Sequence, residues 1–118
     1  MDPVTVFFNP ACSKCRGAVE LLDGRAVPYD VVEYLRAPPD AATLGHLLDL
    51  LGGDPAELVR TDDDAFAGAG LTPADVATRD GVLKVLLAHP GLLQRPVLVR
   101  GDRAVIGRPP ERLAELFD

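Results

Sequence analysis

The sequence predicts an α/β fold built on a mixed β-sheet, and three observations predict it. A strand, a helix and a second strand follow one another between Val4 and Tyr34. A hairpin and a helix form the end of the chain, and a segment with helical periodicity lies in the middle. Because a βαβ unit has parallel strands and a hairpin has antiparallel ones, the sheet that they share is mixed.

The first three elements follow from local patterns. Val4–Phe8 is a nearly continuous apolar run, typical of a strand buried on both faces. Helical spacing of apolar residues predicts a helix over 16–22, and Gly24 provides a C-terminal stop. Residues 28–34 have the composition of a second strand, which should run parallel to the first.

The middle of the chain, about residues 40–90, is predicted to be helical. Asp40 is placed to cap a helix whose leucines recur at helical spacing as far as Gly52-Gly53. Asp54-Pro55 starts a short helix that extends to Arg60. The segment 62–70 has no clear pattern. The further predicted helices begin at Thr72-Pro73 and span 80–88.

The end of the chain has a clear pattern. Residues 97–100 and 103–106 are predicted strands on either side of Gly101-Asp102, a two-residue turn with glycine first. Residues 111–117 are predicted to form the last helix. With no repeats or linkers, we expect a single domain over 1–118 with a helical insertion at about 40–90.

Composition excludes several classes of function. The chain has 118 residues and a net charge of −6, which argues against a general affinity for nucleic acid. Two cysteines make no disulfide framework, and no apolar run approaches the roughly 18 residues that span a bilayer. We therefore expect a cytoplasmic protein without membrane or nucleic-acid partners, and a monomer.

The two cysteines form a CxxC motif at the predicted start of the first helix. The N–H groups and dipole at a helix N-terminus stabilise a thiolate, and Lys14 and Arg16 add positive charge. Cys12 and Cys15 are spaced to share one face of the helix. This predicts redox or thiolate chemistry at Cys12. Cys15 also fits a buried structural position. CxxC after the first strand of this fold is the thioredoxin-type arrangement.

Four segments, in order, resemble one family. The chain is similar to the glutaredoxin-coupled type of arsenate reductase, a thioredoxin-fold family that also includes the Spx-type transcription regulators. The segments are Asn9-Pro10-Ala11-Cys12-Ser13-Lys14, residues 31–39, Leu58-Val59-Arg60-Thr61, and residues 93–97 continuing through Gly107-Arg108-Pro109-Pro110-Glu111.

The resemblance implies a set of site residues. The family's nucleophile corresponds to Cys12, and its three oxyanion-binding arginines correspond to Arg60, Arg95 and Arg108. Its proline before the third strand corresponds to Pro96, which is then expected to be cis and to lie beside the thiol. The residues expected to support the site are Asn9, Ser13, Lys14 and Arg16.

Two positions depart from the family pattern. Cys15 stands where relatives usually have serine or another residue without a thiol, and Phe8 stands where they often have histidine. The first change provides a candidate resolving thiol, and the second removes one possible stabiliser of the thiolate. No bound cofactor or metal is expected, only an external thiol donor: glutathione with glutaredoxin, or thioredoxin.

The expected reaction is the reduction of arsenate to arsenite through a Cys12 thiolate–arsenate adduct. Cys15 or glutathione then supplies the second thiol. Arg95→Ala is expected to weaken turnover strongly while leaving the thiol's reaction with a neutral alkylating agent nearly intact. The alternatives are an Spx-like regulator that binds RNA polymerase and a general thiol–disulfide oxidoreductase.

Overall fold

The computed structural model describes residues 3–117 and divides into two compact units. The first contains the chain up to Ala37 and again from Arg95 onward, and the second contains Pro38–Gln94. The second unit holds most of the helical middle of the chain. The description of the chain as a single domain stays a prediction. Within residues 3–117, no helix is both long enough and apolar enough to cross a bilayer.

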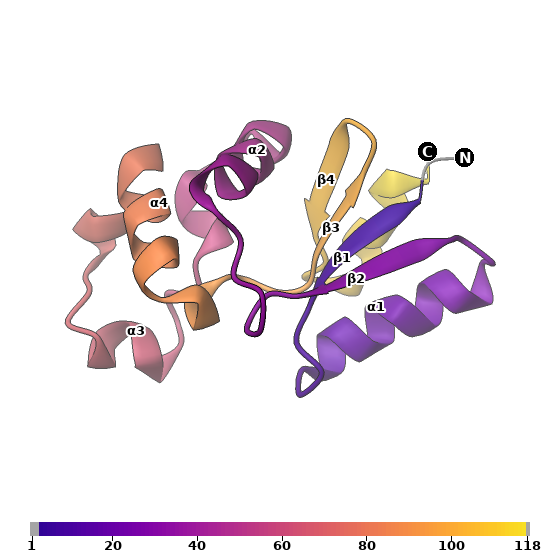
Figure 1. The fold of residues 1–118 in the computed structure, drawn as a ribbon, viewed down its shortest axis with the longest axis horizontal. Helices are drawn as coiled ribbons and strands as arrows, with labels where there is room; N and C mark the ends of the chain where they lie inside the picture. Colours follow the sequence, from indigo (N-terminus) through magenta and orange to yellow (C-terminus); the bar gives the residue numbers. More distant parts are fainter. Residues whose placement is uncertain (1–2, 118) are drawn as a thin grey trace. The chain divides into compact units, whose positions relative to one another are not determined.

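The first unit is built on a four-stranded mixed sheet (Figure 1). Its strand order is β2-β1-β3-β4, with β1 parallel to β2 and the other pairs antiparallel. The apolar run becomes β1, one of the two inner strands, and its adjacent residues Val6 and Phe7 are both buried, as expected for a strand buried on both faces. The elements of this unit are β1 (Val4–Phe8), α1 (Ser13–Gly24), β2 (Tyr29–Glu33), β3 (Val97–Arg100), β4 (Arg103–Ile106) and η4 (Pro110–Leu116).

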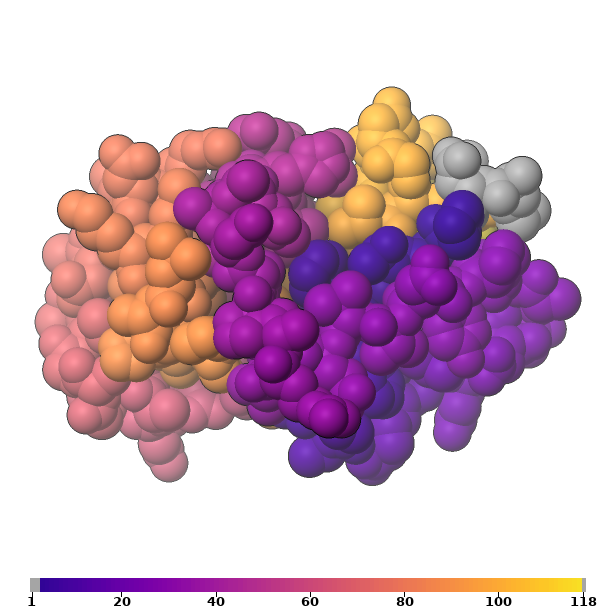
Figure 2. Space-filling model, in the orientation of Figure 1, coloured from indigo at the N-terminus to yellow at the C-terminus, as the bar shows by residue number. Residues whose placement is uncertain are grey.

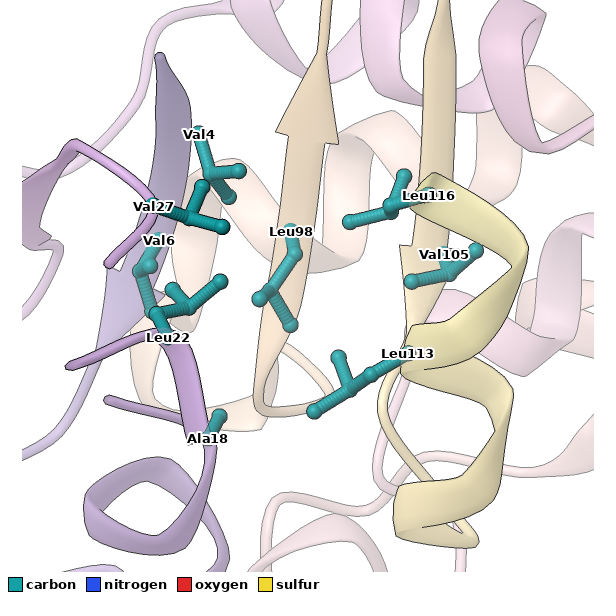
Figure 3. Packing of buried hydrophobic residues seen from close by; sticks show 9 residues of the cluster. All are labelled: Val4, Val6, Ala18, Leu22, Val27, Leu98, Val105, Leu113 and Leu116. Carbon is teal, nitrogen blue, oxygen red and sulfur yellow. The ribbon is translucent and has the colours of Figure 1, made fainter. Parts of the chain in front are cut away.

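One face of this sheet carries the hydrophobic core of the unit. Val4 and Val6 of β1 pack with Leu98 of β3 beneath α1 and η4 (Figure 3). Leu22 of α1 and Leu113 of η4 belong to the same core, so that helices from the beginning and from the end of the chain both pack on this face of the sheet. Burial of these side chains, each worth about 1.5–3 kcal/mol, fixes α1 on the sheet and so fixes its N-terminus.

One edge strand of the sheet is β2, which pairs with β1 alone. Asp30 and Val31 are exposed on this strand, and Figure 2 shows the segment as part of the purple surface. Tyr34, the residue directly after β2, is by contrast fully buried.

The second unit is helical. Asp40 caps its first helix by accepting a hydrogen bond from the Thr43 N–H at 2.8 Å, and Gly52 ends that helix with a φ of 70°. Both roles were predicted from the sequence. The elements of this unit are α2 (Ala41–Leu51), η1 (Pro55–Leu58), α3 (Asp64–Gly68), η2 (Pro73–Val76), α4 (Arg79–Ala88) and η3 (Pro90–Leu92).

Some local predictions were wrong. α1 ends at Gly24, the predicted stop, but the positive φ that was expected of this glycine falls on Ala26. The short helix after Pro55 ends at Leu58 and leaves Arg60 beyond it. Asp63 caps a helix within the segment 62–70, which had been left unassigned. The last helix is a 3-10 helix.

Gly107 allows the end of β4 to approach Pro96 closely. A Cβ on Gly107 would lie 2.9 Å from Cγ of Pro96 and 3.4 Å from Cδ2 of Leu113. The Gly107 N–H donates to the Pro96 carbonyl at 2.9 Å, which continues the β3–β4 pairing beyond the strands. The glycine therefore keeps the segments before β3 and after β4 together.

Gly107→Ala should destabilise the protein by about 1–3 kcal/mol, because the added methyl group overpacks this contact. The free energy of unfolding measured with urea tests it. Gly17→Ala is the matched control: Gly17 lies inside α1 with no atom within 4 Å of an added Cβ. That substitution should stabilise by about 0.5–1 kcal/mol. Equal stability of the two variants would contradict the close-packing argument.

Candidate active site

The site is built where α1 begins. Cys12 is the N-cap residue of α1, and its carbonyl accepts from the Arg16 N–H at 3.1 Å. The turn before it is closed by Asn9, whose carbonyl accepts from the Cys12 N–H at 2.9 Å and whose Oδ1 accepts from the Ala11 N–H at 3.0 Å. Asn9 therefore shapes the turn that presents Cys12 at the helix N-terminus.

The Cys12 sulfur lies in a positively charged environment. Nη2 of Arg108 is 3.8 Å from Sγ of Cys12, and Nε of Arg108 donates to the Arg95 carbonyl at 2.5 Å. Arg95 also interacts with the sulfur through its side chain. Two of the three predicted arginines thus meet Cys12, which is only 6 % exposed.

The surroundings of Cys12 favour its thiolate. Burial acts to raise the pKa of this thiol, but the Cys15 N–H, the Arg95 side chain, the Cys15 side chain and the Lys14 N–H outweigh it. The pKa of Cys12 falls from the usual 9.0 to about 7. The sulfur makes no capping hydrogen bond within standard limits, so these N–H groups act mainly through the electrostatics of the helix terminus. The pKa of Cys12 is lowered although Phe8 stands where the resembling family often has a histidine.

Cys15 is the opposite kind of thiol. It is fully buried, and burial raises its pKa to about 11, helped by the neighbouring Cys12 and opposed by the Asn9 backbone and by Arg95. Both cysteines are free, and their side chains interact. At neutral pH a large share of Cys12 is therefore the thiolate, whereas Cys15 stays a protonated thiol.

Ser13, Lys14 and Arg16, which were expected to support the site, differ in their positions and contacts. Ser13 is the exposed first residue of α1, and Lys14 contributes its backbone N–H. The Arg16 guanidinium donates to the Pro10 carbonyl at 2.9 Å. The Arg95–Pro96 peptide bond is cis, as the family resemblance implied. The Arg108–Pro109 bond is cis as well, which the sequence did not predict.

Arg60, the third predicted arginine, belongs to the second unit. Its Nη1 forms an ion pair with Oδ2 of Asp63 at 2.9 Å. An isolated bridge between Val59 and Leu93 holds its backbone, with the Arg60 N–H donating to the Leu92 carbonyl at 2.8 Å. Sequence reasoning missed the Asp63 partner, although the i, i+3 spacing of opposite charges was available as a signal.

Comparison with known proteins identifies the family. Residues 7–116 match the model of the ArsC family. The chain belongs to the ArsC family.

Sequence similarity to individual relatives extends over almost the whole chain. A protein of Neisseria meningitidis serogroup A named arsenate reductase is 36 % identical over 114 residues, 96 % of this chain and 97 % of that protein. The uncharacterized protein YfgD of Escherichia coli is 38 % identical over 114 residues, 96 % of this chain and 95 % of its own.

A solved ArsC-type structure supports the fold. The arsenate reductase from Vibrio cholerae has a TM-score of 0.84 at 28 % identity, covering 98 % of both chains. This confirms the predicted α/β, thioredoxin-like fold class.

The structure changes the expectation that Arg95→Ala leaves the thiol's reactivity nearly intact. Because Arg95 lowers the pKa of Cys12, its loss leaves less thiolate at neutral pH.

The alkylation rate of the wild type with iodoacetamide should rise with pH to half its maximum near pH 7, while Cys15 stays unlabelled. In Arg95→Ala we expect a higher midpoint and the same maximal rate above pH 10. Peptide mass spectrometry assigns the label, and labelling of Cys15 at pH 7 would contradict the site described above.

Proposed function

We propose that this protein is an arsenate reductase in which Cys12 is the nucleophile. The observation that carries the proposal is a buried cysteine with a pKa of about 7 at a helix N-terminus, contacted by two arginines. A thiolate in such a site attacks an electrophilic centre, and the guanidinium groups bind the oxygens of an anion. The named ArsC relatives supply the substrate class.

The first step forms a bond between Cys12 and arsenic. Arsenate is a phosphate-like oxyanion with two negative charges at neutral pH. The thiolate attacks arsenic and one oxygen leaves, after protonation, as water, giving an adduct in which arsenic is still As(V). Arg95 and Arg108 stabilise the charge on the remaining oxygens, as donors fixed in advance of the reaction do. We assign the same role to Arg60 from its match to the family motif, in exchange for its present partner Asp63.

The second step transfers two electrons to arsenic. Cys15, as its thiolate, attacks the sulfur of Cys12, a disulfide forms, and the electron pair of the S–As bond stays on arsenic, which leaves as arsenite. Part of the raised pKa of Cys15 comes from its neighbour Cys12. That part is lost when the Cys12 sulfur is bonded to arsenic, whereas burial and the charge of the bound oxyanion still oppose the Cys15 thiolate. Arg95, which lowers the pKa of Cys15, favours the loss of its proton to solvent. Thioredoxin or glutaredoxin then reduces the disulfide.

Arg60→Ala should separate oxyanion binding from thiol activation. Arg60 is paired with Asp63 in the second unit, so we expect the alkylation profile of Cys12 to match the wild type. Arsenate turnover should fall at least about tenfold, because one charge-assisted contact to the anion, worth about 1.5–3 kcal/mol, is lost. Arg112→Ala, which removes another helix-associated ion pair, is the control and should keep wild-type turnover. Wild-type turnover in Arg60→Ala would remove Arg60 from the site.

Cys15→Ser tests the route of reduction. We expect NADPH-coupled arsenate turnover of the wild type with thioredoxin and none in Cys15→Ser, with Cys12→Ser inactive in every case. Turnover that needs glutathione with glutaredoxin and is indifferent to Cys15 would show that glutathione is the second thiol. Absence of turnover with all donors would instead favour the regulator or the general thiol–disulfide oxidoreductase.

A further inference from the structure

The register of the sheet brings four polar side-chain positions into one row. The parallel pairing of Phe8 with Glu33 places the next residues, Asn9 and Tyr34, side by side. The antiparallel pairing of Phe7 with Val97, continued by two residues, brings Arg95 level with Asn9.

The same register extends across the hairpin. Val97 pairs with Ile106, so Arg95 lies level with Arg108, and the hydrogen bonds of Gly107 and Arg108 to the β3 side continue this pairing. The order along the row is Tyr34, Asn9, Arg95, Arg108. Tyr34 is the member that sequence reasoning did not place in the site.

Tyr34 is a buried residue whose hydroxyl lacks a conventional partner. Its side chain is 0 % exposed, and within residues 3–117 no hydrogen bond to the hydroxyl has the usual distance and angle. A buried hydroxyl without a full hydrogen bond opposes folding, and phenylalanine would fill the same space without that cost. The hydroxyl therefore needs a reason other than packing.

The groups that act on this hydroxyl belong to the Cys12 site. Burial raises the pKa of Tyr34, the Arg95 guanidinium and the Asn9 side chain oppose that rise, and Cys15 adds to it. Tyr34 thus stays a neutral phenol at neutral pH. Burial acts to lower the pKa of Arg95, whereas Cys12 and Tyr34 raise it. Arg95 and Cys15 each interact with both the phenol and the nucleophile, and of the two only Arg95 carries a charge at neutral pH.

We propose that the Tyr34 hydroxyl is a positioning group that holds the Arg95 guanidinium against the Cys12 sulfur. The Arg108 side chain binds the backbone of Arg95 at its carbonyl. The Tyr34 hydroxyl interacts with the Arg95 guanidinium, although no full hydrogen bond joins the two groups. The hydroxyl acts through Arg95 and does not itself touch a ligand, because it has practically no accessible surface. The proposal rests on the role given above to Cys12 as a reactive thiolate.

Other charges near Cys12 are accounted for. Arg108 approaches the sulfur from β4, Cys15 lies on α1 as a protonated thiol, and the Arg16 guanidinium is bonded to the Pro10 carbonyl. The Lys14 side chain is exposed. None of these contacts involves the Tyr34 hydroxyl except that of Cys15, so a change at Tyr34 reaches Cys12 mainly through Arg95.

Tyr34→Phe tests the proposal by the pH profile of Cys12 alkylation with iodoacetamide. With Arg95 less firmly held, the midpoint should move above 7, so that the rate at pH 6 falls by about threefold or more. The rate at pH 10, where both proteins carry the thiolate, should be unchanged. Tyr29→Phe is the matched control: it removes the same hydroxyl from the other end of β2, where Tyr29 pairs with Val4, and should keep the wild-type profile.

A double variant tests whether the effect passes through Arg95. In an Arg95→Ala background, Tyr34→Phe should cause no further change in the profile. An additive shift would overturn the proposal, as would a wild-type profile in Tyr34→Phe alone. A Tyr34→Phe protein that melts well below the wild type would mean that the hydroxyl is structural, which also overturns it.

The substrate provides a last distinction. If Tyr34→Phe keeps the wild-type alkylation profile but raises the KM for arsenate, the hydroxyl contacts the oxyanion directly and the proposal is wrong. Because alkylation requires no arsenate, the profile is decided even if the protein fails to turn arsenate over. The failure of this proposal is therefore distinguishable from the failure of the proposed function.

Discussion

The pairing of β1 with a strand on each side is the constraint on which the site depends. β1 aligns β2 in parallel and β3 antiparallel, and β3 in turn aligns β4. The carboxyl end of β1 leads into Cys12, and the adjoining ends of the other strands supply Arg95 and Arg108. Because side chains alternate along a strand, a slip of one residue in any of these pairings would turn a different face toward the sulfur.

Much of the fold was predictable because its signals are local. The apolar run of β1, the Asp40 cap and the Gly101-Asp102 turn each act over a few neighbouring residues. Errors arose where the outcome depends on tertiary packing. The last helix tightens to 3-10 geometry where Leu113 and Leu116 enter the core, and Ala26, which has no glycine-like sequence signal, takes the positive φ after α1.

The site divides along the same line. Cys12 and its helix N-terminus were predictable from spacing, and the arginines were found through resemblance to a family. Neither route shows that Arg60 is paired with Asp63, nor that Arg95 changes the acidity of Cys12. Those facts depend on side-chain conformation. Tyr34 was treated only as the end of a strand, because its relation to the site exists only when β1 and β2 are in register.

The different burial of the two sulfurs has a consequence for any disulfide between them. A reductant approaching from solvent reaches Cys12, which is slightly exposed, before Cys15, which is fully enclosed. Attack on the Cys12 sulfur expels Cys15, and burial, the largest cause of its raised pKa, makes Cys15 a poor leaving group. Access and leaving-group chemistry thus oppose each other. The reducing partner must loosen the start of α1 or deliver a proton to Cys15, and a small thiol that can do neither would reopen the bond slowly.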